Sequence, residues 1–310
     1  NLVRALLDKG HAVRALIYVD GPALDGLDVE KVPGNVLDSE SLEKAFDGAD
    51  TVYHLASAIT LGTDPNGRVR EINVRGVENV ARACLRRGVR RLLHFSSVHA
   101  LSPYPADAPV DETRPLALLP ELPAYDRSKA EAEQVLLGIV EREHLDAVIV
   151  NPTGIVGPND FENSRMGRVL LDFRAERIPA LIPGGFNWVD VRDVSAGAMA
   201  AAEHGRTGER YLLGGQWHSM RQVAETVTDV TGARPPRITC PFQFAKMVAP
   251  LKELLDAARG VEGGFNRASL HALTNHKDID CAKAKRELNY SSRPFLDTVR
   301  DTFAWFDARA

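Results

Sequence analysis

Three side chains near the middle of the chain have the types and the spacing that proton transfer to a carbonyl oxygen requires. Tyr125 and Lys129 lie four residues apart at the start of a helical pattern, so they share one face of a helix. An ammonium group beside a phenol is expected to lower the phenol pKa from its ordinary value of about 10. Ser97 follows an apolar segment and supplies a hydroxyl that can hold the same oxygen. The sequence therefore predicts a general acid/base site.

The elements around these residues decide how much weight the pattern carries, because Tyr-x-x-x-Lys is common by chance. The apolar segment 92–95 has the character of a buried strand and leads into Ser96-Ser97. A Pro-rich loop follows, and the next helix is predicted from Tyr125 to about Glu143. A serine at a strand end and a Tyr–Lys pair at the following helix start are typical of a site at one edge of a parallel sheet.

The first half of the chain alternates between strand and helix patterns. Helices are predicted at 2–10, ending at a C-cap glycine, at about 39–46, capped by Ser39 or Ser41, and at 68–87, ending at Gly88. Strands are predicted at 11–18, 32–38, 50–56, 91–96 and 147–152. This alternation implies right-handed crossovers, so the predicted fold class is α/β with a doubly wound parallel sheet.

Glycine and proline residues interrupt the second half, which is predicted to form shorter elements. A helix is predicted at 194–203, a strand at 210–213, a helix from its cap Ser219 to Val230, and a last helix at about 294–306. The sequence contains no Ser/Gly linker and no internal repeat. Two parts, 1–153 and 154–310, are therefore expected to pack around a cleft, and the segment of about 187–205 is expected to return to the first part.

Composition and charge narrow the classes of partner. Of the 310 residues, 44% are hydrophobic and 26% are charged, and the net charge of -4 provides no general attraction for nucleic acid or anionic membranes. No apolar run approaches the roughly 20 residues of a membrane span. The three cysteines lie far apart, without metal-ligand spacing. We expect a small-molecule substrate, a cytoplasmic location and no bound metal, and a homodimer is left open.

Small and polar residues follow the predicted strands, at the edge where an open parallel sheet binds its ligands. These strand ends carry Tyr18, the segment 35–38, Leu55-Ala56-Ser57, Ser96-Ser97 and Asn151-Pro152-Thr153. Apart from Tyr18, they would let a flat ligand approach the backbone closely. The alternative is that they only connect strands to loops.

Six stretches occur in the order and at the spacing of a known family. They are 52–57, 72–77, 95–97, 125–129, 151–158 and 188–194. With them the chain resembles the extended short-chain dehydrogenase/reductase superfamily, also called the NAD-dependent epimerase/dehydratase family, over nearly its whole length. It is most similar to dihydroflavonol-reductase-like and hopanoid-associated sugar epimerase-like members. The resemblance implies a Rossmann-type dinucleotide-binding domain at 1–153 and a smaller, mostly helical substrate-binding region at 154–310.

The resemblance also implies a role for each matching residue. Tyr125 would be the general acid/base, Lys129 its partner and a ligand of the cofactor ribose, Ser97 the second donor to the substrate oxygen, and Asn73 a structural support. Tyr125 and Lys129 would also line the cofactor groove, together with Asn35, Val36, Leu55, Ala56, Ser57, Ser96, Asn151, Pro152 and Thr153. Asn35 departs from the aspartate that is usual in the family.

The start of the chain departs from the family pattern. Family members open with a strand and a Gly-x-x-Gly-x-x-Gly turn that holds the dinucleotide pyrophosphate at a helix N-terminus. This sequence starts in what resembles the helix after that turn, so a front segment of roughly a dozen residues is expected to be missing. The segment Tyr18-Val19-Asp20 does not decide between NAD and NADP. The reductase-like relatives favour NADP.

The function that the resemblance implies is an NAD(P)-dependent oxidoreductase that transfers hydride between nicotinamide and a substrate carbonyl or alcohol. A nucleotide-sugar epimerase or dehydratase is the first alternative, although the segment 151–154 looks more reductase-like. A dinucleotide-sensing protein without catalysis is the second alternative. The intact set of Ser97, Tyr125 and Lys129 disfavours that alternative, because a sensor does not need the phenol.

The substrate side is less defined by the sequence. Residues of the loop 99–124 and the aromatic residues Phe161, Phe186 and Trp188 could line a pocket or pack as ordinary core. Arg165 and Arg168 could bind a diphosphate or lie on a solvated helix face.

Overall fold

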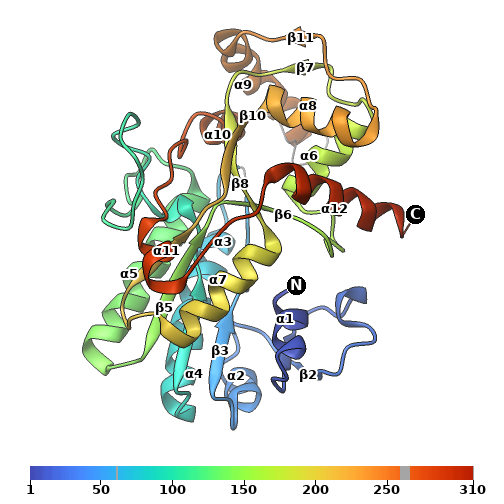
Figure 1. Cartoon of the computed structure of the whole chain (residues 1–310). Coiled ribbons are helices and arrows are strands. Elements are labelled where there is room, and N and C mark those ends of the chain that lie inside the picture. Colours follow the sequence, from blue (N-terminus) through green and yellow to red (C-terminus); the bar gives the residue numbers. More distant parts are fainter. Residues whose placement is uncertain (61, 259–265, 310) are drawn as a thin grey trace.

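The central feature of the computed structural model, which describes residues 1–60, 62–258 and 266–309, is a four-stranded parallel sheet. Its strands lie in the order β3 (Thr51–His54), β4 (Arg91–Phe95), β5 (Ala147–Pro152) and β9 (Arg210–Leu213). All six residues of β5 are buried, as expected for an inner strand covered on both faces. Figure 1 shows the helices that surround these strands.

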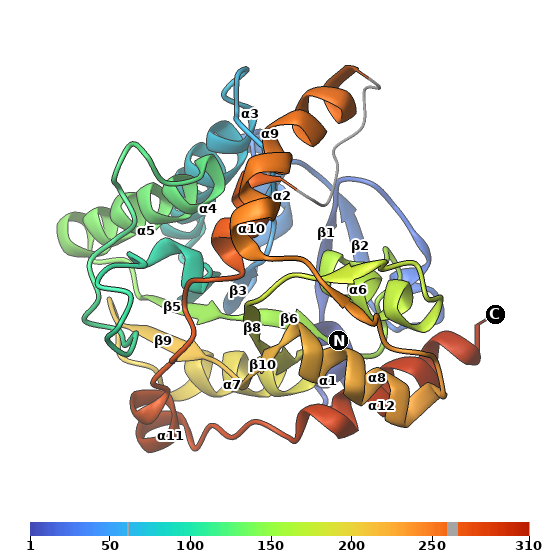
Figure 2. The ribbon, with the colours of Figure 1, turned by 90° about the horizontal axis from the view of Figure 1, so that it is seen from above.

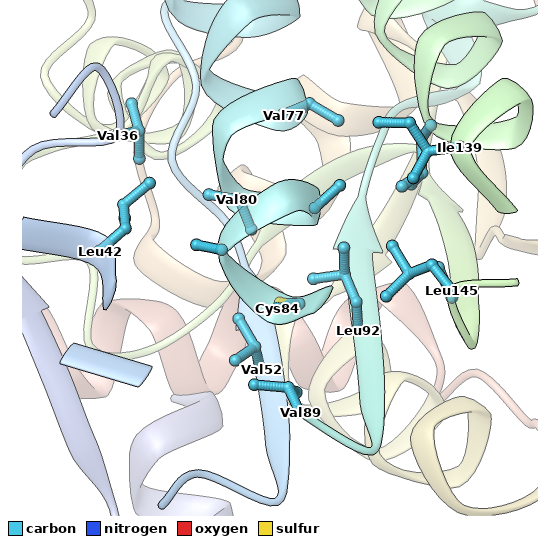
Figure 3. Packing of buried hydrophobic residues seen from close by; sticks show 14 of the residues in the cluster. Val36, Leu42, Val52, Val77, Val80, Cys84, Val89, Leu92, Ile139 and Leu145 are labelled. Atoms are coloured by element: carbon cyan, nitrogen blue, oxygen red, sulfur yellow. The ribbon is translucent and has the colours of Figure 1, made fainter. Parts of the chain in front are cut away.

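Successive residues of a strand point to opposite faces of the sheet, and β4 shows how this builds two cores. Leu92 packs with residues of α2 (Ser39–Phe46), α4 (Gly76–Arg87) and α5 (Ala124–Glu143), and Figure 3 shows these side chains together. Leu93 packs on the other face with residues of β9 and α7 (Val191–His204). Helices therefore cover both faces, and the predicted doubly wound α/β fold is confirmed.

The beginning of the chain forms a separate small layer. β1 (Arg14–Ile17) and β2 (Glu30–Pro33) pair in parallel with each other, and within the described ranges neither strand pairs with β3. The predicted first helix is confirmed as α1 (Leu2–Asp8). Its residues Leu2 and Leu6 pack against Met199 of α7, with Tyr53 and Phe95 of the sheet beside them. The apolar face of α1 therefore covers one side of β3 and β4.

The helix predicted at 68–87 is continuous but changes its hydrogen-bond period. It consists of α3 (Arg68–Arg70), a π-helical turn at Glu71–Arg75 and α4, and Gly88 ends it in the left-handed conformation at φ 64. A π-helical turn widens the helix locally and often occurs at a functional position. In this chain the turn carries Asn73.

The second half adds a three-stranded sheet and a group of helices. The sheet has the order β10 (Gln216–Ser219), β8 (Gly185–Asp190) and β6 (Gly154–Val156), and a smaller pair joins β7 (Ala180–Leu181) to β11 (Ile238–Thr239). The helices are α6 (Arg165–Arg174), α8 (Met220–Thr231), α9 (Phe242–Ala258), α10 (Arg267–Ala272), α11 (Ala282–Leu288) and α12 (Phe295–Asp307). In Figure 1, α8, α9 and α10 lie in the upper part, whereas α11 lies lower and contacts α7 and β9. Figure 2 shows them from above, with α10 next to α9. Among the described residues, no helix has both the length and the apolar character needed to cross a bilayer.

Two predicted helix caps have different outcomes. Ser219 caps α8 through a capping box with Gln222, as predicted. The predicted cap of α2 by Ser39 or Ser41 is wrong, because Asp38 caps that helix and its carboxylate accepts from the backbone N–H groups of Glu40 and Ser41. A carboxylate at this position also interacts favourably with the positive end of the helix dipole.

Candidate active site

The structure brings Ser97, Tyr125 and Lys129 together beyond the carboxyl end of β4. Ser97 caps the short 3-10 turn Val98–Ala100, and Tyr125 lies in the first turn of α5. The Ser97 hydroxyl lies close enough to the Tyr125 phenol to lower its pKa. The ammonium of Lys129 donates to the carbonyl oxygen of Phe95 at 3.0 Å. The end of β4 therefore positions both the hydroxyl and the ammonium relative to the phenol.

The electrostatic environment of the Tyr125 phenol differs from the prediction. Burial raises its pKa to about 12, and the nearby Asp126 carboxylate acts in the same direction, whereas the Ser97 hydroxyl and the charge of Arg165 lower it. Lys129 instead directs its ammonium to a backbone carbonyl. The predicted lowering of the phenol pKa is therefore wrong for this structure, and Tyr125 stays protonated near neutral pH. A protonated phenol suits the role of a general acid.

Lys129 is almost completely buried, with 3% of its surface exposed. Burial lowers the pKa of its ammonium to about 8, and the Glu133 carboxylate one turn along α5 opposes that effect. Close to neutral pH, Lys129 therefore keeps its charge inside the protein, but the charge is lost at only slightly higher pH.

Asn73 connects the π-helical turn to the start of α5. Its Oδ1 accepts from the Ala58 backbone N–H at 2.7 Å and from the Ser57 hydroxyl at 3.0 Å. Its Nδ2 donates to the Ala58 carbonyl oxygen and to the Ser128 hydroxyl, each at 2.9 Å. Ser128 in turn donates to the Tyr125 carbonyl oxygen at 2.7 Å. This network agrees with the supporting role expected for Asn73.

Replacing Asn73 by Ala is expected to lower the free energy of unfolding by about 1–3 kcal/mol, because the buried groups it serves lose their partner. Asn79→Ala provides a matched control, since the Asn79 side chain makes a bond to the Val36 carbonyl at 3.0 Å and lies nearer the surface. Urea unfolding of both variants measures the difference. Equal losses in the two variants would contradict the special position of Asn73.

The residues expected near the cofactor differ in how accessible they are. Leu55, 48% exposed, and Ala56 present an open backbone beyond β3, as a flat ligand requires. Asn35 uses its Oδ1 to accept from the Leu37 backbone N–H at 2.9 Å, so this side-chain oxygen already has a partner. Val36 packs closely on α4, where a Cβ at Gly76 would lie 3.1 Å from it. These features fit a dinucleotide lying along the ends of β2 and β3.

The predicted residues after β4 and β5 lie deeper. Asn151 is fully buried, and its Nδ2 donates to the Ser97 carbonyl oxygen at 3.0 Å and to Glu133 at 2.5 Å. Pro152 and Ser96 are buried as well, and Thr153 donates its hydroxyl to Asn187 at 2.8 Å. Asn151 and Thr153 therefore use these side-chain groups to hold the ends of β4, β5 and β8 in place. Their predicted contact with the cofactor stays a prediction.

Sequence reasoning missed two groups that surround these residues. Glu133, with a completely buried side chain, pairs with Arg210 of β9 at 3.0 Å. Asp126 pairs with His99 at 3.3 Å. The signal for Glu133 is its position one turn beyond Lys129 on α5, and the signal for Asp126 is its place directly after Tyr125. Neither signal identifies the partner, because folding is what brings Arg210 next to Glu133 and His99 next to Asp126.

The residues considered for the substrate side have separate surroundings. Phe161 packs edge-on against Trp305 at 5.2 Å between ring centroids, and Phe186 packs against Trp188 at 6.0 Å. Trp188 is a core residue with 2% of its surface exposed. Arg165 and Arg168 are exposed on α6. The alternative of core packing is therefore correct for Trp188. Arg165 lies close enough to Tyr125 for its charge to lower the pKa of the phenol.

Comparison with known proteins agrees with this site. Residues 1–214 match the model of the NAD dependent epimerase/dehydratase family. Sterol demethylase protein B of Methylococcus capsulatus is 35% identical over 100% of this chain and 95% of its own length. A putative dihydroflavonol 4-reductase of Synechocystis is 29% identical over 99% of this chain and 90% of its own length.

The fold has a close counterpart among solved structures. The crystal structure of the protein gox2253 is 32% identical, with a TM-score of 0.87, and the match covers 100% of this chain and 94% of that one. The predicted resemblance is confirmed in both sequence and fold. This chain belongs to the NAD dependent epimerase/dehydratase family of extended short-chain dehydrogenases/reductases, whose members include NAD(P)-dependent oxidoreductases.

Proposed function

We propose that this protein reduces a carbonyl compound with NAD(P)H and that Tyr125 is the general acid. The observation that carries the proposal is the convergence of Ser97, Tyr125 and Lys129 at the end of β4. A phenol that keeps its proton at neutral pH favours the direction of reduction, in which a proton is donated to the substrate.

In the proposed reaction, Ser97 and Tyr125 hold the substrate oxygen between two hydroxyl groups. Bound NAD(P)H supplies the hydride to the carbonyl carbon. As negative charge develops on the oxygen, Tyr125 gives up its phenol proton to it, and Ser97 keeps its hydrogen bond to the same atom. Lys129, one helix turn away, donates to the Phe95 carbonyl oxygen and would hold the ribose of the bound cofactor.

Leu55 and Ala56 would hold the nicotinamide half of the cofactor, and Asn35 and Val36 the adenine half. We favour NADP. In dinucleotide-binding folds, an acidic residue after the strand that corresponds to β1 normally binds the ribose 2′-hydroxyl of NAD. Asp20 occupies that region, but it pairs with Lys31 at 3.0 Å. The carboxylate is thereby partly neutralised, and Lys31 provides a cation for a 2′-phosphate.

An apolar ring ketone is the substrate class that the surroundings favour. Leu118 and Leu119 of the loop before α5 are 41% and 45% exposed, and Phe244 and Met247 of α9 are 54% and 69% exposed. The charge of Asp126 raises the pKa of His271 on α10, and the charge of Lys246 on α9 lowers it. Both helices therefore lie beside the site. The relatives named for sterol and dihydroflavonol chemistry support this class.

A nucleotide-sugar epimerase is the alternative, and the exposed cations Arg165 and Arg168 are the observation that favours it. Incubation with NADPH and cholestanone, a dihydroflavonol or a UDP-sugar distinguishes the two. Consumption of NADPH in equal amount to the ketone supports the reductase. Conversion of the sugar without net consumption contradicts it, and dinucleotide binding without turnover of any compound supports a sensor.

The rate of reduction is expected to fall as the pH rises above about 8. Lys129 has a pKa of about 8, and above that pH the buried group loses the charge with which it would hold the cofactor ribose. A profile of kcat/KM against pH measures this, because it reports the ionisations of the free enzyme. A rate that stays constant or rises through this pH range would show that the charge on Lys129 is not needed.

A further inference from the structure

A groove in the second half of the chain carries two arginine side chains that the proposed reduction does not use. It lies where the chain enters β7 and β11, and it encloses about 360 Å³. These strands pair in parallel, with Ile238 beside Ala180, and Figure 1 shows them at its upper edge. Beyond their carboxyl ends, Ile182 and Cys240 pack with α9 and α10. The groove is therefore at the end of the two strands that lies away from the candidate active site.

The backbone of the segment 234–237 sets the direction of the two arginine side chains. A proline fixes its own φ, and the residue before a proline favours extended backbone. Pro235 and Pro236 therefore favour a polyproline II conformation, which has three residues per turn. Side chains three positions apart lie on the same side of such a segment. In agreement, Arg234 and Arg237 both line the groove.

Glu176 lies on another wall of the groove and fixes the position of this segment. Its Oε1 accepts from the Arg234 backbone N–H at 3.1 Å. The two prolines have no backbone N–H. The donors that the stretch 234–236 offers to a ligand are therefore on the Arg234 side chain, and Arg237 adds a second guanidinium group on the same side.

The groove has an excess of positive charge. Arg234 and Arg237 are exposed, and among the residues that the structure describes no group accepts from either guanidinium. The nearby Arg174 and Arg177, by contrast, each pair with an aspartate. Glu176 is the carboxylate among the lining residues, so two positive charges face one negative charge. An anion is therefore attracted to the groove.

Two guanidinium groups on one side of a segment suit a phosphate better than a carboxylate. A carboxylate has two oxygens in one plane, and a single guanidinium fork occupies both. A phosphate monoester has three terminal oxygens, so it accepts from two guanidinium groups at once. Other parts of the groove are apolar and consist of Phe173, Ile178 and Pro179 together with the proline pair. An apolar ring attached to the phosphate would lie against them.

We propose that this groove binds a phosphate monoester that carries an apolar ring. Arg234 and Arg237 hold the phosphate, and the ring lies against Ile178 and Pro179. Glu176 shapes the groove through its bond to the backbone, while its charge weakens the binding of the anion. The ligand takes no part in the reduction and joins the amino-terminal ends of β7 and β11.

Calorimetric titration of the full chain with phenyl phosphate tests the proposal. We expect saturable binding that Arg234→Gln and Arg237→Gln each weaken about tenfold, because charge-assisted hydrogen bonds are lost. Glu176→Gln should strengthen binding about threefold, since it removes a negative charge but keeps the oxygen that accepts from the Arg234 backbone. Arg286→Gln is the control, because Arg286 is 67% exposed on α11, and its affinity should equal that of the wild-type protein.

Benzoate and inorganic phosphate separate the two parts of the ligand. Benzoate has a ring without the phosphate, and inorganic phosphate has the anion without the ring. Each should bind about tenfold more weakly than phenyl phosphate, because each makes only part of the contacts. Benzoate binding as tight as that of phenyl phosphate would overturn the assignment to phosphate. Equally tight binding of inorganic phosphate would overturn the role of the apolar residues.

The variants decide whether the groove is the binding site. If Arg234→Gln and Arg237→Gln bound like Arg286→Gln, phenyl phosphate would be an adventitious ion only, and the proposal would be overturned. Weaker binding by Glu176→Gln would also overturn it, because the charge of Glu176 would then not oppose the ligand. Urea unfolding should give the same midpoint for all four variants. Weakened binding that accompanied a lower midpoint would show damage to the fold and would contradict a direct contact.

Discussion

Tyr125→Phe is expected to reduce the rate of carbonyl reduction by about a hundredfold to ten-thousandfold, the range in which a general acid contributes. The substitution removes the proton donor beside Ser97 but keeps the aromatic ring in the first turn of α5. The free energy of unfolding should therefore change by only about 1 kcal/mol. Steady-state oxidation of NADPH with an accepted ketone measures the rate.

Tyr53→Phe is the matched control for this change. Tyr53 lies on β3 and packs against the cluster of Leu2, Leu6 and Met199, on the side of the sheet that α1 covers. Loss of its hydroxyl should leave the reduction rate close to that of the wild-type protein. If Tyr125→Phe retained a rate comparable to that of Tyr53→Phe, the acid would have to be another group.

Glu133→Gln is expected to lower the free energy of unfolding by about 3 kcal/mol, because it removes one partner of a buried ion pair. The side chain of Glu133 is completely buried, and that of its partner Arg210 is 18% exposed. Nε of Arg210 lies 3.0 Å from Oε2 of Glu133. Glu133 also accepts from Asn151 at 2.5 Å and raises the pKa of Lys129. The same variant should therefore lose activity at a lower pH than the wild-type protein does.

Glu131→Gln provides the comparison on the same helix. Glu131 also pairs with an arginine, Arg70, at 2.6 Å, but the two side chains are 30% and 66% exposed. Such an exposed pair is worth at most about 1 kcal/mol. Urea unfolding of both variants should therefore separate them clearly. Similar stabilities would mean that the pair between Glu133 and Arg210 does not hold α5 to β9.

Much of the first half of the fold could be predicted from local patterns. Three elements form where they were expected: the strands at 91–96 and 147–152 and the helix from Tyr125. Each of these segments contains its own hydrophobic periodicity and its own terminating residues. The pairing of β9 with β5 could not be predicted, since that strand follows α7 and carries no signal of its neighbour. The order β10, β8 and β6 could not be predicted either, because none of these strands carries a signal of its neighbour.

The candidate site divides along the same line. Ser97, Tyr125 and Lys129 were identifiable because their spacing and sequence context are local. The pKa values of these groups could not be predicted, because they depend on burial and on partners that are distant in the sequence. Lys129 donates to the Phe95 carbonyl oxygen, and Asp126 pairs with His99. Asn151 looked like a groove residue at a strand end, yet it is fully buried. Burial of a strand end is set by the segments that fold over it.

Transfer of deuterium from labelled NADPH to a ketone tests the central claim most directly. The substrates are cholestanone and a dihydroflavonol, with a UDP-sugar as the alternative, and the cofactor carries deuterium at the hydride position. We predict that the wild-type protein forms alcohol with deuterium on the carbinol carbon. Tyr125→Phe should form almost none of this labelled alcohol. Alcohol formed without the label, or formed as fast by Tyr125→Phe, would contradict hydride transfer assisted by Tyr125.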